Sequence, residues 1–206
     1  MPIISKEVIK NSRDRVKSYV RPDIQVEFVN IDYGPASIES VYDDTLAAPF
    51  VVKKAEWAEK NGYDAVVVSC MMDPGVRAAK ETVDIPVVGP KEAADSIASI
   101  LGDRIAGIYP SGLTVLELAK DPKKTYDVLL ENAKKAVNEG AQVLILRCTG
   151  LTGLAKRLQK ELGVPVLEGE GLALSLAQML VDVGLSQSKL AFPRPSKKKR
   201  TFPVAD

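Results

Sequence analysis

The sequence has no histidine among its 206 residues. Ser-His-Asp triads, Cys-His dyads and the usual zinc and iron sites all need an imidazole, so this absence excludes those classes of chemistry. The phosphate-binding patterns GxxxxGKS/T and GxGxxG are also missing, and the GEG at 169–171 is too short to replace them. A reactive side chain in this protein must therefore work without histidine.

Cysteines are few, and the chain lacks long apolar runs and a strong net charge. Two cysteines do not make a disulfide framework, and an intracellular setting keeps them as free thiols. The net charge is +1, no apolar run approaches the ~20 residues of a membrane span, and no signal-peptide pattern is found. We expect a cytoplasmic protein with no membrane or nucleic-acid partner, whose basic run RPSKKKR lies in a solvated tail.

Short apolar runs alternate with helical patterns along the chain. The runs are rich in Val and Ile on both faces, which is typical of a parallel sheet covered by helices, and this predicts the α/β class. Strands are expected at 24–31, 64–69, 85–89, 104–109, 142–147 and 164–169. Helices are expected at 45–60, 74–82, 91–101, 112–139, 150–162 and 170–184.

An internal repeat relates residues 61–101 to residues 139–180. At a constant offset of 78 residues, the repeat places Gly62 on Gly140, Cys70 on Cys148 and Gly75 on Gly153. Each unit reads strand, cysteine, helix, short strand, helix. A single buried cysteine is commonly just a small apolar residue, but two cysteines at matching positions indicate a shared function.

Both cysteines follow a predicted strand and precede a predicted helix. In open α/β sheets, ligands bind beyond the carboxyl ends of the strands, and a helix start favours negative charge, so we expect a thiol pKa below its usual value of about 8.5. Two pseudo-symmetric halves would point Cys70 and Cys148 into one cleft. One thiolate could then remove a proton from carbon while the other thiol protonates the opposite face, which inverts a stereocentre without a cofactor.

At these residues the sequence resembles the aspartate/glutamate/hydantoin racemase superfamily, and within it the hydantoin racemase branch. The resemblance lies in YGPASIES, DAVVVSCMMDPG with IPVVGPKEAA, and GAQVLILRCTGLTGLAKRL with GVPVLEG. It implies that Cys70 and Cys148 are the paired acid and base. The amino-acid branch usually has CNT and GCTE, whereas CMMDPG and CTGLTG favour hydantoin-like substrates.

The resemblance also implies two Rossmann-like lobes, each a parallel sheet flanked by helices, with the active site in the cleft between them. We expect the N-terminal lobe to comprise residues 1–90 with a returning helix in 169–190. The C-terminal lobe comprises 91–168, and the basic tail 191–206.

Two features depart from the family pattern. Family members begin with a full strand that runs into an NPNxS loop, whereas MPIIS predicts at most a stub before a helix of about residues 5–19, with Ser5 as its remaining polar side chain. Arg147 stands where the family commonly has glycine. Its cation could lower the pKa of Cys148 or hold an anionic substrate, or strand alternation could turn it to the other face.

Other polar residues near the predicted strand ends have two interpretations each. Asp73 could cap the helix that Pro74 begins, or it could line the pocket. Thr149 and Gly150 could donate a hydroxyl and a backbone N–H to an enolate oxygen, or form a second cap. Glutamates 92, 168 and 170 also lie at strand ends, but glutamates are common at helix starts. The candidates for substrate binding are Ser5, Met71, Asp73, Ser111, Thr149 and Gly150.

The sequence thus predicts a cofactor-independent racemase with no metal, acting on a carbon acid such as a 5-substituted hydantoin or an amino acid. We expect a small-molecule substrate and a homo-oligomer. A decarboxylase or a cis–trans isomerase on the same scaffold is one alternative. A small-molecule-binding protein that has lost turnover is the other.

Overall fold

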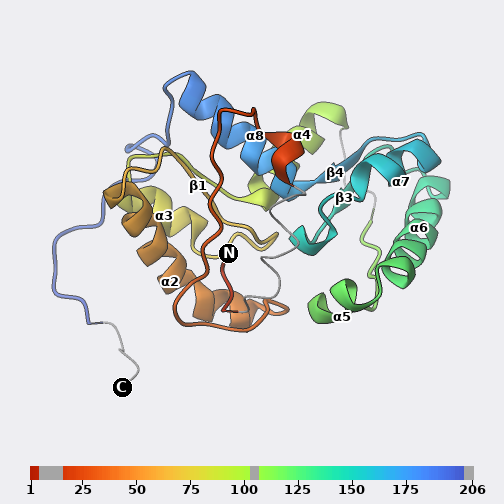
Figure 1. Ribbon diagram of the computed structural model, residues 1–206, viewed down its shortest axis with the longest axis horizontal. Helices are drawn as coiled ribbons and strands as arrows, with labels where there is room; N and C mark the ends of the chain where they lie inside the picture. Colours follow the sequence, from red (N-terminus) through yellow and green to blue (C-terminus); the bar gives the residue numbers. More distant parts are fainter. Residues whose placement is uncertain (5–15, 103–106, 202–206) are drawn as a thin grey trace.

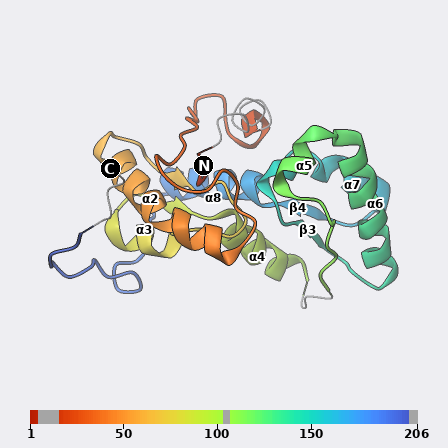
Figure 2. The ribbon, with the colours of Figure 1, turned by 90° about the horizontal axis from the view of Figure 1, so that it is seen from below.

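The computed structural model describes residues 1–4, 16–102 and 107–201 of the chain. Its helices and short strands alternate, and they form two groups that lie side by side (Figure 1, Figure 2). The α/β prediction is therefore confirmed. In chain order the elements are η1 (Lys17–Tyr19), α2 (Val41–Lys60), β1 (Val66–Val67), α3 (Val76–Thr82), β2 (Val87–Val88), α4 (Pro90–Leu101), α5 (Val115–Lys120), α6 (Pro122–Asn138), β3 (Leu144–Leu146), η2 (Thr149–Leu151), α7 (Ala155–Leu162), β4 (Val166–Glu168) and α8 (Gly169–Asp182).

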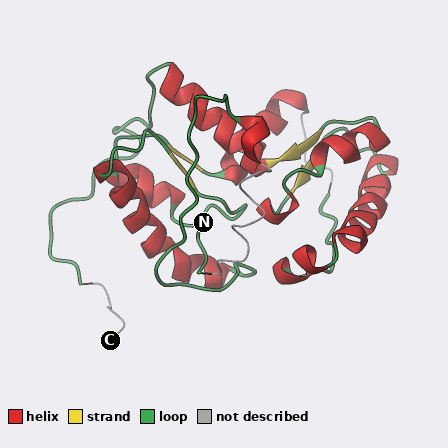
Figure 3. Ribbon diagram, viewed as in Figure 1, coloured by secondary structure: helices red, strands yellow, loops and turns green. Residues whose placement is uncertain are grey.

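Each group contains one small parallel sheet (Figure 3). Strand β1 pairs with β2, with Val66 opposite Val87, and strand β3 pairs with β4, with Leu144 opposite Val166. Helix α3 connects the first pair of strands and α7 connects the second. The order strand, helix, strand, helix therefore occurs twice, as the sequence repeat predicts.

The described part of the chain has fewer strands than we expected. Residues 24–31 and 107–109 form no strand. The first segment bonds to the chain start at Met1: the Met1 ammonium donates to the Val29 carbonyl (2.5 Å), and the Ile31 N–H donates to the Met1 carbonyl (3.2 Å). These two bonds have the pattern of parallel pairing but extend over one residue, which is too short for a ladder. The predicted helix at 5–19 lies largely outside the described residues, and residues 17–19 form η1.

Helix α2 covers one face of the first sheet. Its N-cap Ser40 accepts the Asp43 N–H (3.1 Å), which satisfies a donor that the first turn leaves open. Its buried face carries Ala47, Val51 and Ala55. These residues pack with the valines of α3 and the sheet in one apolar cluster, which makes this the core of the first lobe.

The second lobe has its own core around Leu158 and Tyr126, built from α5, α6, α7 and the β3–β4 sheet. The helix expected at 112–139 is divided in two at Asp121. The Asp121 carboxylate accepts the Lys124 N–H (3.0 Å), and Pro122 has no N–H for a continuing helix, so α5 ends and α6 begins there.

Helix α8 packs on β1 and β2 and along α4, and it also contacts β4 (Figure 1). Small buried residues at this contact, Ala93, Ala173 and Ala177, allow the two helices to approach closely. Helix α8 therefore starts beside the second sheet and ends against the first. The exact lobe boundaries stay a prediction. None of the helices in the described ranges is both long and apolar enough to cross a bilayer.

Candidate active site

Cys70 lies in a tight turn just beyond β1. Its N–H donates to the Val68 carbonyl (2.6 Å), and its own carbonyl accepts the Asp73 N–H (3.0 Å). The thiol is half-buried and packs at the edge of the first core. Helix α3 begins only at Val76, so the turn separates the thiol from the helix start.

Cys148 holds the matching place beyond β3. It precedes the single-turn helix η2, and its carbonyl accepts the Leu151 N–H (3.0 Å). The thiol is half-buried at the edge of the second core. Gly150 is exposed, and a Cβ there would lie 3.4 Å from the sulfur of Cys148, so glycine keeps this side of the thiol open.

The two cysteine loops meet between the lobes. The hydroxyl of Thr149, which follows Cys148, donates to the carbonyl of Ser69, which precedes Cys70, over 3.4 Å. The charge of Cys148 also raises the pKa of Cys70, which requires the two sulfurs to be near each other. The fold thus brings together two thiols that lie far apart in the sequence.

The pKa of the Cys70 thiol differs from our expectation. Burial is the largest cause, and the thiol pKa rises to about 12. The charges of Cys148, Asp44 and Asp73 also raise it, and the backbone N–H of Met72, which donates to the sulfur, lowers it. The prediction that a helix start depresses this pKa is therefore wrong for Cys70, because α3 begins too far along the chain to offset the loss of solvation.

Asp73 caps a helix, but not the one we expected. Its two carboxylate oxygens accept the N–H groups of Lys91 (3.0 Å) and Glu92 (2.9 Å) in the first turn of α4. The helix after Pro74 is preceded instead by Gly75 in the left-handed region. Asp73 itself has φ 55°, a conformation rare for a residue with a side chain, so the turn aims its carboxylate at α4.

The remaining predicted binding residues lie in different surroundings. The Met71 side chain is buried, and its sulfur fills the space that a Cβ at Gly169 would occupy. Ser111 is half-buried, and its hydroxyl accepts the Leu113 N–H (3.2 Å). Ser5 lies outside the described residues. Roles for these three residues in substrate binding stay predictions.

Sequence reasoning did not find the residues that join the two loops. Glu170, in the first turn of α8, is 3% exposed. It accepts the Ser69 hydroxyl (2.5 Å) beside Cys70 and the Thr152 hydroxyl (3.0 Å) beyond Cys148. A glutamate at a strand end was the available signal, but its distant partners could not be inferred from the sequence.

Two further carboxylates lie near the cysteine loops. The sequence analysis gave Glu168 no specific role and did not consider Asp44. Glu168 is buried and accepts the N–H groups of Gly153 (2.7 Å) and Ala155 (3.4 Å), and burial raises its pKa. Asp44, in the first turn of α2, has its pKa raised by burial, and its Oδ1 has no hydrogen-bond partner among the described residues. Its charge acts on Cys70. Asp44 is thus a buried acceptor near the first thiol.

Arg147 is exposed, while Ser69, its counterpart in the repeat, is buried. The exposure of Arg147 fits the interpretation in which strand alternation turns it away from the thiols.

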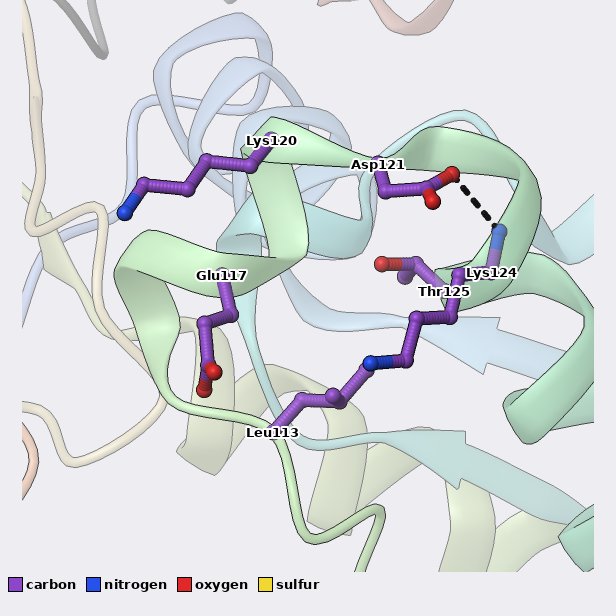
Figure 4. Close-up of a pocket in the computed structure, with 6 residues that line it drawn as sticks. All are labelled: Leu113, Glu117, Lys120, Asp121, Lys124 and Thr125. Carbon is purple, nitrogen blue, oxygen red and sulfur yellow. Dashed lines mark hydrogen bonds between the residues drawn. The ribbon is translucent and has the colours of Figure 1, made fainter.

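Two surface cavities lined by described residues include neither thiol in their lining. One lies at the opposite end of the β1–β2 sheet, between the last turns of α2 and α8. The other cavity lies between α5 and α6 (Figure 4) and is lined by Leu113, Glu117, Lys120, Asp121, Lys124 and Thr125.

Among the described residues, no cluster of acidic or thiol ligands is arranged to hold a metal ion.

Comparison with known proteins identifies the family of this chain. Residues 5–108 and 95–177 match the Asp/Glu/Hydantoin racemase family. The chain is 34% identical over 226 residues to hydantoin racemase of Pseudomonas sp. (strain NS671), covering 96% of this chain and 91% of that protein. It is 33% identical over 227 residues to hydantoin racemase of Paenarthrobacter aurescens, covering 96% of each.

The fold agrees as well. The structure of allantoin racemase from Klebsiella pneumoniae matches with a TM-score of 0.91 at 26% sequence identity, covering 98% of this chain and 94% of that one. Allantoin racemase from Pseudomonas fluorescens matches with a TM-score of 0.90, also at 26% identity, covering 98% of this chain and 97% of that one. This chain therefore belongs to the Asp/Glu/hydantoin racemase family and is an isomerase of the racemase type.

Proposed function

We propose that this racemase inverts C5 of a 5-substituted hydantoin or related cyclic ureide by proton transfer between Cys70 and Cys148, without a cofactor. One thiolate removes the C5 proton, and the electron pair of the broken C–H bond moves into the adjacent carbonyl to give an enolate. The opposite thiol then protonates C5 from the other face. The thiol and thiolate have exchanged roles, so the enzyme is ready for the reverse reaction.

The observation that carries this proposal is the hydrogen bond from the Thr149 hydroxyl to the Ser69 carbonyl. Each of these residues is the chain neighbour of one cysteine, so the bond limits how far apart the two thiols can lie. A two-base inversion needs two acid/base groups on opposite sides of one carbon. The contact between the loops supports that arrangement.

The mutual influence of the thiols supports a shared proton. The charge of Cys148 raises the pKa of Cys70, so ionisation of one thiol opposes ionisation of the other. A pair that loses one proton therefore keeps the second. This state, with one thiolate and one thiol, is what each direction of the reaction requires.

The charges that raise the pKa of Cys70 favour a substrate without a carboxylate. They are those of Cys148, Asp44 and Asp73, all acidic. A cation, the Met1 ammonium, is also coupled to this thiol, but burial lowers its pKa to about 6. A free amino acid would bring its carboxylate against the three acidic groups, whereas a cyclic ureide is neutral and offers N–H donors. We assign the buried Oδ1 of Asp44 as the acceptor of a ring N–H.

The residue after Cys148 has a role in this scheme. The Thr149 hydroxyl already donates to Ser69, so the backbone N–H of Thr149 is the group that we assign to the enolate oxygen. Donors placed where charge develops stabilise the transition state more than the ground state.

The test is to incubate the enzyme with one enantiomer of a 5-monosubstituted hydantoin, of allantoin, or of an amino acid in D₂O. Optical rotation and mass are followed against a no-enzyme control, because C5 of hydantoins also exchanges slowly by itself. We expect the rotation of a cyclic ureide to decay to zero with gain of one deuterium, and that of the amino acid to persist. Decay at the no-enzyme rate for every ureide would contradict the proposal.

A further inference from the structure

Glu170 is a buried acid that reaches both cysteine loops at once. One carboxylate oxygen accepts the Ser69 hydroxyl (2.5 Å) and the other accepts the Thr152 hydroxyl (3.0 Å). Ser69 directly precedes Cys70, and Thr152 closes the single turn that follows Cys148. All three side chains are at least nine-tenths buried.

The same residues are linked a second time. The Thr152 hydroxyl also contacts the Thr149 carbonyl (2.7 Å), and the Thr149 hydroxyl donates to the Ser69 carbonyl (3.4 Å). Starting from Glu170, the contacts run through Thr152, Thr149 and Ser69 and return to Glu170. The result is a closed ring of polar contacts that contains the neighbours of both thiols, in which the single proton of the Thr152 hydroxyl is shared between the Glu170 carboxylate and the Thr149 carbonyl.

A buried polar ring of this kind holds its members firmly, because each broken bond leaves a polar atom away from water. Surface loops have no comparable constraint. Since α8 is packed on β1, β2 and α4, the backbone of Glu170 is held in place by these contacts. The ring therefore ties the two cysteine loops to one packed helix.

From this geometry we infer that Glu170 is a positioning residue that sets the spacing of the two thiols. The inference rests on the proposed two-thiol racemisation. A positioning role predicts different losses of racemisation and of hydrogen exchange, whereas a general role in stability predicts equal losses of both. Racemisation needs both sulfurs on one carbon, whereas hydrogen exchange with retention needs only one sulfur.

Glu168 provides an internal comparison. It is also buried and lies two residues earlier, but its described bonds go to the backbone N–H groups of residues 153–155, all after Cys148 in the second loop. Loss of Glu168 should weaken that loop and lower stability. It should change racemisation and exchange together, because it does not join the loops.

The experiment compares Glu170→Leu with Glu170→Gln, and uses Glu131→Gln on the exposed face of α6 as the matched control. Leucine removes both bonds. Glutamine keeps an acceptor for Ser69 and offers an N–H₂ to the Thr152 oxygen. For each variant, racemisation of one hydantoin enantiomer and deuterium exchange with retention are measured in the same D₂O sample.

In Glu170→Leu we expect racemisation to fall about a hundredfold and exchange by less than about tenfold, because a small misplacement affects the two-sulfur step most. Glu170→Gln and the control should keep the wild-type ratio of the two rates. Equal losses of both rates in Glu170→Leu would overturn the inference. Ser69→Ala and Thr152→Val each break one arm of the ring, so they decide the question if the leucine variant does not fold.

A second measurement does not depend on activity. The chain has only two cysteines, so a short bifunctional thiol reagent can bridge only Cys70 and Cys148 within one molecule. We expect the yield of the bridged species to fall in Glu170→Leu and to match wild type in Glu170→Gln. Equal yields in all variants would overturn the positioning role. An inactive wild type would contradict the proposed function alone, since this yield still tests the spacing.

Discussion

The loops that carry Cys70 and Cys148 are tied to their lobes by the same kind of link, a carboxylate that accepts backbone N–H groups, but the link runs in opposite directions. In the first lobe the cysteine loop supplies the acid, because Asp73 caps the start of α4. In the second lobe the acid comes from the end of β4, because Glu168 accepts N–H groups of the cysteine loop.

The internal repeat shows how the linking acid can come from the cysteine loop in one lobe and from the strand end in the other. Gly89 in the first unit falls on Glu168 in the second. A Cβ at Gly89 would lie 2.2 Å from the Cγ of Asp73, so the space that a side chain would occupy is filled by the Asp73 carboxylate. In the second unit, the Glu168 side chain itself extends from that place. Both lobes thus link the cysteine loop to the end of the next strand and the helix that follows it. The carboxylate is Asp73 of the cysteine loop in the first lobe and Glu168 of the strand end in the second.

The largest effect expected in this comparison concerns thiol reactivity. Because burial raises the pKa of Cys70 to about 12, iodoacetamide should alkylate it at pH 8 on the order of a thousandfold more slowly than in the unfolded chain. The rate should still rise with pH beyond pH 10, since the thiolate fraction has not reached its limit. Peptide mapping separates the two cysteines, and a plateau for Cys70 near pH 9 would contradict this reading.

Gly89→Ala should break the link in the first lobe. The new methyl group expels the Asp73 carboxylate, which crowds the site and uncaps α4, so the free energy of unfolding should fall by about 3 kcal/mol. Urea denaturation measures this. Gly102→Ala is the matched control, because among the described residues its Cβ would meet nothing closer than Val143 at 3.8 Å. Equal stability of the two variants would show that the Asp73 link contributes nothing.

Asp73→Ala and Glu168→Ala test whether the two links are equivalent. Each change leaves two backbone N–H groups without their acceptor, so each should cost about 1–2 kcal/mol in free energy of unfolding. The costs should add in the double variant, because the two acids hold different loops. A neutral effect of either change, seen in the same urea titration, would make that lobe's link incidental.

Asp44→Asn should have the smallest effect, and a local one. Loss of the charged acceptor should raise KM for a cyclic ureide about tenfold, with a smaller change in kcat. Asp43→Asn is the control, because the Asp43 carboxylate already bonds Ser40 (2.7 Å) and the Glu39 N–H (3.2 Å). A KM that changes equally in both variants would place Asp44 outside the substrate site.

The sequence was sufficient for the features that repeat locally. The α/β class and the parallel pairing follow from valine-rich runs such as 66–68 and from their alternation with helical patterns. The position of Cys70 and Cys148 just after β1 and β3 follows from the repeat. The strand expected at 24–31 is absent, because a strand depends on a paired neighbour, and in the described part of the chain the backbone bonds that join this segment to another segment go to one residue, Met1.

The links at the site could not be predicted for a related reason. Ser69 and Glu170 are 101 residues apart, and Asp73 and Lys91 are 18 apart, so neither pair is marked by local spacing. The thiol pKa was misjudged because a sequence pattern shows where a helix starts but not how deeply a side chain is buried. Asp44 was missed because an acid in the first turn of a helix ordinarily stabilises the helix by interacting with its dipole.

The most direct test of the account compares Cys70→Ser with Cys148→Ser. In D₂O, both variants should lose racemisation of a hydantoin in both directions, since inversion needs both thiols and the chain has no histidine to activate serine. Each variant should keep deuterium exchange with one enantiomer only, and the two variants should prefer opposite enantiomers, because each surviving thiolate serves one face. Full racemase activity in either variant, or exchange with the same enantiomer in both, would contradict the assignment of Cys70 and Cys148 to opposite faces of one carbon.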